Sequence, residues 1–218
     1  MLGIIGRELA RLARLFAAGN PLDLPDVPRA HGSWNHTDIE WLAPKVANVA
    51  GDFAEIGVFR GAAFRKVAEL AARQGKLAHA FDSFAGMDEP TAADGTGYPK
   101  GKFDIGGPAE FTRLMDKAGV PRDHYRMWAG YVPRCFGGVP RELRFSFVIL
   151  DLDHYKPTVD ALQWLTPRIN AGGILALDDY APNGTALASK AIREFLARDR
   201  LFRKVAQFNQ QLILRRIA

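Results

Sequence analysis

Residues 145–153 read Phe-Ser-Phe-Val-Ile-Leu-Asp-Leu-Asp, and the fold can be worked out from this stretch outward. Five of its first six residues are apolar, and several are aromatic or β-branched, which is typical of a strand buried on both faces. The strand ends abruptly in Asp151 and Asp153. A second stretch repeats the design, because Gly172-Gly173 and four apolar residues precede Asp178 and Asp179.

Two buried strands that each end in acids predict an α/β protein of the open, mostly parallel type, with helices on both faces of the sheet. In such sheets ligands bind at the carboxyl ends of the strands. Carboxylates that converge there repel each other unless protons or a cation neutralise them. Oxygen ligands suit Mg²⁺, Mn²⁺ or Ca²⁺, so the pattern predicts a divalent cation.

The length and composition of the sequence argue against several other classes of protein. The chain has 218 residues, enough for one sizeable α/β domain, and 48% of them are hydrophobic. Its net charge of +5 comes from dispersed Lys and Arg residues, so we expect no nucleic-acid partner. The single cysteine, Cys135, excludes an intramolecular disulfide and fits a reducing, cytoplasmic location.

The first thirty residues are expected to form a separate segment, followed by one domain over 31–218. Residues 2–18 have apolar and arginine faces at helical spacing, and a Pro-rich linker follows over 21–28. A basic amphipathic helix can lie on a membrane, but we expect this one to dock on its own domain or to mediate self-association. The sequence contains no run of about 20 apolar residues, which a membrane-spanning helix would need, so we expect no membrane span.

The stretch 52–61, Asp-Phe-Ala-Glu-Ile-Gly-Val-Phe-Arg-Gly, predicts a strand and a glycine-containing turn before an Ala-rich helix. Gly57 is expected to turn tightly beside a ligand, and Gly61 to let the helix approach the strand. A second strand ends in Asp82, where an acid accepts hydrogen bonds from ribose hydroxyls in folds of this kind. The spacing indicates a nucleoside-containing cofactor, although Asp82 also fits a purely structural cap.

The remaining segments are predicted more coarsely. Residues 83–110 read as a long Gly- and Pro-rich loop, of the kind that often serves as a lid or binding loop. Helices are expected over about 37–49, 108–118, 155–167 and 185–199, and strands at 125–130 and 211–214.

Four stretches together resemble the macrocin O-methyltransferase family: residues 55–61, 81–86, 150–158 and 172–180. The resemblance covers roughly residues 31–217 in the expected order. It implies a Rossmann-like class I methyltransferase fold, to which the helix expected over residues 2–18 is added. It also implies a metal-dependent enzyme that uses S-adenosylmethionine to methylate a sugar hydroxyl of a natural product, as family members do on macrolide and aminocoumarin antibiotics. The expected partner is thus a small hydroxylated acceptor.

The resemblance also assigns residues. The implied Mg²⁺ ligands are Asp151, Asp178 and Asp179, and the implied general base is Asp153. His154 is an alternative base, because imidazole titrates near neutrality. The residues expected at the cofactor are Glu55, Gly57, Phe59, Arg60 and Gly61 at the methionine half, Asp82, Ser83 and Phe84 near the ribose, Trp128 and Gly130 near the adenine, and Asp151.

Two other classes of function stay open from the residues alone. One is a nicotinamide-dependent oxidoreductase, which the absence of Gly-x-Gly-x-x-Gly and the presence of the acids disfavour. The other is a binding module without catalytic activity, for which Asp178 and Asp179 would only form the turn after a strand.

Overall fold

The computed structural model describes residues 36–94, 98–180, 187–208 and 210–217. The predicted helix at 2–18 and the linker at 21–28 lie outside these residues. The predicted domain boundary at residue 30 therefore stays a prediction.

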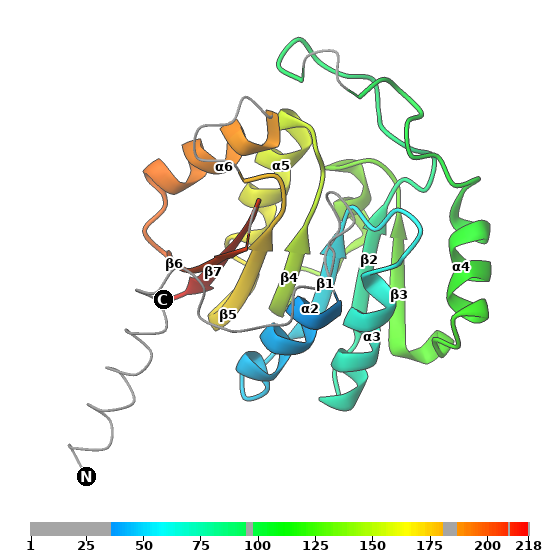
Figure 1. Ribbon diagram of the computed structural model, residues 1–218, viewed down its shortest axis with the longest axis horizontal. Helices are drawn as coiled ribbons and strands as arrows, with labels where there is room; N and C mark the ends of the chain where they lie inside the picture. The colour runs from blue at the N-terminus through cyan, green and yellow to red at the C-terminus, as the bar shows by residue number, and fades with distance from the viewer. Residues whose placement is uncertain (1–35, 95–97, 181–186, 209, 218) are drawn as a thin grey trace. The chain divides into compact units, whose positions relative to one another are not determined.

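The centre of the fold is one seven-stranded sheet with the order β3-β2-β1-β4-β5-β7-β6 (Figure 1). Strands β1 to β5 run parallel to one another, whereas β7 is antiparallel to both of its neighbours, β5 and β6. The strands are β1 (Asp52–Ile56), β2 (Ala78–Asp82), β3 (Tyr125–Ala129), β4 (Phe145–Leu150), β5 (Ile169–Leu177), β6 (Phe202–Phe208) and β7 (Gln211–Arg216). The order reverses between β1 and β4, and such a switch point opens a crevice at the carboxyl ends of these two strands.

All six residues of β4 are buried, as its sequence predicts for a central strand. Its side chains serve two apolar cores on opposite faces of the sheet. Phe147 and Ile149 belong to the core beneath α2 (His36–Leu42), α3 (Phe64–Arg73) and α4 (Pro108–Lys117). Val148 and Leu150 belong to the core beneath α5 (Tyr155–Leu165) and α6 (Leu187–Arg198). The prediction of helices on both faces is confirmed.

The predicted helix over 37–49 is shorter than expected. It ends as an α-helix at Leu42 and continues as a 3₁₀ turn, η1 (Ala43–Val46). The physical reason is Pro44, which has no N–H to donate to the carbonyl of Glu40 and whose ring would clash with it. Two further 3₁₀ turns, η2 (Arg122–His124) and η3 (Arg134–Gly138), flank β3.

Strand β6 is not among the elements that the sequence predicts. Among the described strands it pairs with β7 alone and lies at the edge of the sheet, where Arg203 and Lys204 are exposed. An edge strand with charged residues has a weak hydrophobic pattern, which explains the omission.

Candidate active site

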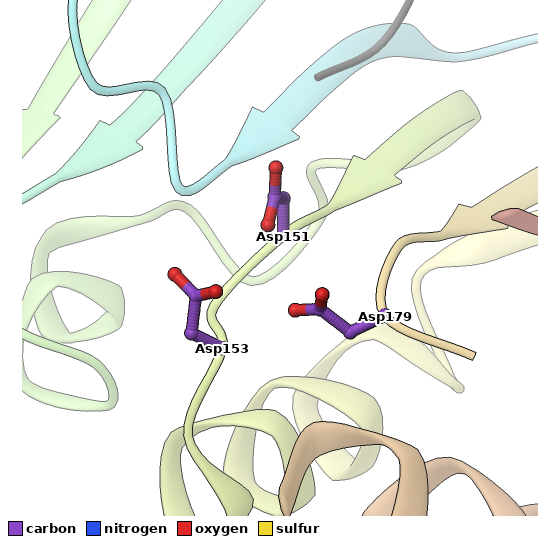
Figure 2. A group of neighbouring side chains, drawn as sticks. All are labelled: Asp151, Asp153 and Asp179. Carbon is purple, nitrogen blue, oxygen red and sulfur yellow. The ribbon is translucent and has the colours of Figure 1, made fainter. Parts of the chain in front are cut away.

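Four aspartates follow the adjacent strands β4 and β5. Leu150 and Leu177 are paired at the ends of these strands, so Asp151 and Asp178 leave the sheet side by side. One carboxylate oxygen from each of Asp151, Asp153 and Asp179 lies within 4.8 Å of the other two, and Figure 2 shows the three side chains converging. The convergence predicted from the sequence is thus present.

Asp178 is placed differently from the other three. It is 4% exposed, and one of its oxygens accepts a 3.0 Å hydrogen bond from the Asp179 amide. Its carboxyl lies against that of Asp151, as Asp179 lies against Asp153, close enough for each pair to share a proton. Two of the three predicted metal ligands, Asp151 and Asp179, therefore lie in the group of carboxylates that could hold a metal ion. The third member of that group is Asp153 and not the predicted Asp178.

Burial and mutual repulsion make the cluster hard to ionise. Burial, reinforced by Asp178 and Asp153, raises the pKa of Asp151 well above its usual range. Burial and Asp179 raise the pKa of Asp178 to about 7, while burial and Asp153 raise that of Asp179 to about 6. Carboxylates held together in this way need protons or a cation.

The donor set fits a hard divalent cation. Within the described residues, the buried Oδ2 atoms of Asp178 and Asp179 have no hydrogen-bond partner. Oxygens on opposite sides of a Ca²⁺ ion lie about 4.6–5.2 Å apart, and those around Mg²⁺ at most about 4.2 Å apart. One oxygen from each of Asp151, Asp153 and Asp179 lies within 4.8 Å of the other two, so a single divalent cation with oxygen ligands could contact all three.

Two members of this group have a left-handed backbone. The φ angles are 58° at Asp153 and 59° at Asp179. Aspartate tolerates this conformation better than most residues, but it still costs about 1–2 kcal/mol. Backbone strain of this kind concentrates at functional sites, where the surrounding structure holds it in place.

The turn after β1 packs directly against the end of β4. Gly57 has φ +87°, and a Cβ at this position would lie 1.6 Å from the carbonyl oxygen of Asp151. Only glycine fits such an approach. Gly61, by contrast, faces Met115 and Phe111 of α4, so its role is helix packing and not the expected approach of helix to strand.

Asp82 ties two turns together. Its Oδ2 accepts hydrogen bonds from the amides of Val58 (2.7 Å) and Phe59 (2.8 Å), and its Oδ1 accepts one from Phe84 (2.7 Å). These bonds use three of the roughly four lone-pair positions of a carboxylate. Asp82 therefore holds the turn after β1 against the turn after β2, and one acceptor position of its carboxylate is left for a ligand.

The two residues after Asp82 shape the loop more than the site. The Ser83 hydroxyl donates to the carbonyl of Gly86 at 2.6 Å. The Phe84 ring is buried and stacks on Phe111 with 4.6 Å between centroids, so it belongs to the core. Only the backbone of Phe84 lies at the turn.

Trp128 also has an internal partner that the sequence did not reveal. Its indole N–H donates to Nδ1 of the buried His79 at 3.0 Å, and Nε2 of His79 lies 3.0 Å from Asp52. The ring stacks with those of His79 and Phe81. These hydrogen bonds from Trp128 through His79 to Asp52 fix the orientation of the Trp128 ring. Trp128 lies close to Gly130, whose amide donates to the Asp82 carbonyl at 2.9 Å.

Glu55 and Arg60 differ sharply in exposure. Glu55 is buried, its Oε2 has no hydrogen-bond partner among the described residues, and burial, Asp82 and Asp178 raise its pKa well above the usual range. A buried carboxyl of this kind is a ready acceptor for a cationic group. Arg60 is exposed, and its charge acts on Glu110 of α4.

The loop between β2 and α4 reaches the acid cluster and supplies residues there that no sequence pattern indicates. The negative charge of Asp153 raises the pKa of Tyr98, whose ring lies 6.0 Å from that of His154. Lys102 lies over the Tyr98 ring at 4.5 Å. A loop without periodicity gives no sequence signal for such contacts.

His154 is only 2% exposed, and its Nε2 is buried with no hydrogen-bond partner among the described residues. Asp153 is more open and faces the other carboxylates (Figure 2). The geometry therefore favours Asp153 over His154 as the group that reaches a substrate.

Strand order 3-2-1-4-5-7-6, a glycine turn after β1 and acids after β4 and β5 together define the class I methyltransferase fold. The sequence model of the macrocin-O-methyltransferase (TylF) family matches residues 42–213. The chain belongs to this family.

A curated relative from Streptomyces olivaceus is 8-demethyl-8-(2,3-dimethoxy-alpha-L-rhamnosyl)-tetracenomycin-C 4'-O-methyltransferase, which is 32% identical over 145 residues. The match covers 61% of this chain and 54% of the relative, so the chain spans about half the relative's length.

Two solved structures show the same fold. The O-methyltransferase NovP superposes with a TM-score of 0.73 at 22% identity, over 84% of this chain and 79% of that one. A calicheamicin methyltransferase has a TM-score of 0.69 at 23% identity, over 96% and 92% of the two chains. No helix in the described part of the chain is long and apolar enough to cross a membrane.

Proposed function

We propose that this chain is an S-adenosylmethionine- and divalent-cation-dependent O-methyltransferase that acts on a sugar hydroxyl of a natural product. The observation that carries the proposal is the juxtaposition of the Gly57 turn and the acid cluster, with Asp151 touching both. The relative from Streptomyces olivaceus, whose name specifies a 4'-O-methyl transfer on a rhamnosyl-tetracenomycin, supports a sugar as the acceptor.

Each proposed cofactor-binding residue contacts a different part of the cofactor. Glu55 would receive the positive ammonium of the methionine half, because its buried oxygen has no donor among the described residues. Asp82 would offer its remaining acceptor position to the ribose, and Trp128 and Gly130 would border the base. When bound, S-adenosylmethionine supplies an electrophilic methyl group and the cation supplies positive charge that favours the ionised acceptor hydroxyl.

Asp153 is proposed to take the proton of that hydroxyl. It faces the cluster, whereas Nε2 of His154 is buried. A proton acceptor must lie within hydrogen-bonding reach of the proton, and holding oxygen and methyl carbon about 3–3.5 Å apart contributes much of the rate. Asp151 and Asp179 are proposed as cation ligands, with Asp178 as the third ligand implied by resemblance and Asp153 as the geometric alternative.

Calorimetry and methyl transfer test this function. S-adenosylhomocysteine should bind to the purified protein, and NAD should not. Transfer of labelled methyl groups to a panel of glycosides should stop in excess EDTA and return with Mg²⁺. Binding of NAD in place of S-adenosylhomocysteine would point to an oxidoreductase, and full transfer in EDTA would refute the role of the cation.

A further inference from the structure

A line of three polar side chains joins β1, β2 and β3 within the apolar core beneath α5. His79 of β2 is only 3% exposed, and its ring lies against those of Phe81, Phe145 and Trp128. The Trp128 indole N–H donates to Nδ1 of His79 at 3.0 Å, and Nε2 of His79 lies 3.0 Å from a carboxylate oxygen of Asp52, the first residue of β1. An apolar side chain would fill this space without the cost of burying polar groups, so the histidine calls for an explanation.

The partners of His79 fix the direction of both hydrogen bonds. An indole N–H can only donate, so Nδ1 of His79 accepts and the ring proton lies on Nε2, which donates to Asp52. Burial opposes ionisation of Asp52, but hydrogen bonds from His79 and from the Leu77 amide hold its pKa below the usual value. Asp52 is therefore a carboxylate at neutral pH and can only accept. Trp128 thus faces one oriented acceptor, which Asp52 holds from the other side.

Trp128 lies next to the ends of β2 and β3, which are bound together. It is paired with Phe81, and its half-buried ring stacks on that of Phe81 with 6.0 Å between centroids. The next pair along the two strands is Asp82 and Ala129, and the Gly130 amide then donates to the Asp82 carbonyl at 2.9 Å. The orientation of the indole therefore affects the turn that is proposed to border the base of the cofactor.

We propose that His79 is a positioning residue for the cofactor: its Nδ1 holds the Trp128 indole in the orientation that borders the base of S-adenosylmethionine. This role rests on the proposed function and adds to it a residue that does not itself touch the cofactor. A side chain that is held in place before binding loses little rotamer freedom when the ligand arrives, so the fixed indole favours tighter binding.

Two substitutions of His79 separate its two hydrogen bonds. In His79→Asn the amide oxygen can take the place of Nδ1 and accept from Trp128. In His79→Gln the amide nitrogen can take the place of Nε2 and donate to Asp52, which leaves Trp128 without its acceptor. Calorimetry with S-adenosylhomocysteine should show about 3–10-fold weaker binding for His79→Gln, the usual share of one hydrogen bond. Binding by His79→Asn should stay within about twofold of the native affinity.

Trp128→Phe tests whether the effect passes through the indole. It should also weaken binding by about 3–10-fold, and His79→Gln added to it should change the affinity by less than about twofold further. Ser146→Ala is the control for a disturbed core, because this buried hydroxyl donates to the Gly51 carbonyl at 2.8 Å and has no part in the line. We expect it to lower the Tm and to leave the affinity for S-adenosylhomocysteine unchanged.

Three results would overturn the role of His79. One is native affinity in His79→Gln. Another is an equal loss in His79→Asn and His79→Gln, which would come from a disturbed core. The third is a double variant in which the losses from His79→Gln and Trp128→Phe add, because the two residues would then act separately.

A further measurement on the native protein does not depend on whether the His79 variants fold. In isotope-labelled protein the indole N–H resonance of Trp128 is identified by its absence from Trp128→Phe. It should exchange slowly with solvent and should shift when S-adenosylhomocysteine is added. Fast exchange, or a resonance that the ligand leaves in place, would refute the positioning role. Failure of the proposed function is distinguishable, because the native chain would then not bind S-adenosylhomocysteine at all.

Discussion

The carboxylate of Asp94 accepts a 3.0 Å hydrogen bond from the backbone amide of Lys156, 62 residues further along the chain. Lys156 lies in the first turn of α5, whose N-cap residue His154 provides no side-chain cap. Asp94 is 1% exposed and is itself held by the Thr91 hydroxyl at 2.5 Å. The loop between β2 and α4 thus caps the helix that follows Asp153, which fixes the loop against the site.

Asp94→Ala should release this loop. Burial works against ionisation of Asp94, but hydrogen bonds from Thr91 and from the Lys156 amide hold its pKa below the usual value, so the cap is charged at neutral pH. Loss of a helix cap costs about 0.5–2 kcal/mol. We expect a lower Tm and faster proteolytic cleavage within residues 85–104. Glu89→Ala, an exposed change in the same loop, is the control, and equal cleavage of both variants would contradict the role of the cap.

Gly57→Ala should destabilise the protein far more than Gly75→Ala. Both glycines have positive φ, 87° and 66°, so both substitutions cost about 1–2 kcal/mol in backbone strain. At Gly57 the new Cβ would also overlap the Asp151 carbonyl, whereas nothing lies within 4 Å at Gly75. We expect a further loss of at least about 2 kcal/mol, measured by urea unfolding. Similar losses for the two variants would refute the close approach.

Asparagine variants separate cation ligands from the proton acceptor. Asp151→Asn and Asp179→Asn should lose Mg²⁺ affinity in calorimetry. Asp153→Asn should keep that affinity while turnover falls by about 10²–10⁴-fold, the usual share of a general base. Asp178→Asn should lose the metal if the ligand set implied by resemblance is right. The opposite pattern, in which Asp153→Asn loses the metal and Asp178→Asn keeps it, would establish the geometric set Asp151, Asp153 and Asp179.

Asp82→Ala should affect both folding and cofactor binding. The three backbone amides that donate hydrogen bonds to Asp82 would lose their acceptor. We expect this loss to cost about 1–3 kcal/mol of folding stability. Loss of a ribose contact would appear separately, as a smaller increase in Tm on adding S-adenosylhomocysteine. If the ligand raises the Tm equally in the variant and the native chain, Asp82 holds only the turn.

Cys135 should be unreactive at ordinary pH. Burial raises the pKa of its thiol to about 11. Since the thiolate is the reactive form, about 0.1% of the thiol is ionised at pH 8, and alkylation should accelerate with pH up to about 11. In urea the same thiol should follow the profile of a free cysteine with a pKa of about 8.5. Fast alkylation of the folded protein at pH 8 would contradict the buried position.

The sequence by itself determined the central sheet and the acids that follow it. An apolar run such as 145–150 has few alternatives to a buried strand, and parallel strands place Asp151 and Asp179 at the same edge. The turn at Gly57 was equally predictable, because a glycine after a strand and before a helix carries a local signal. These features depend on residues that are close together in the sequence, so the local pattern of apolar residues and glycines predicts them.

Only the tertiary structure decided which groups share a site. Asp153 and Asp178 both follow a strand end in the sequence, but the structure brings Asp153, with its left-handed backbone, into one group with Asp151 and Asp179 and buries Asp178 more deeply. Tyr98 and Phe103 lie in a loop without periodicity, and the Phe84 ring turns into the core. Contacts between residues far apart in the chain depend on loop conformation and packing, which no local pattern encodes.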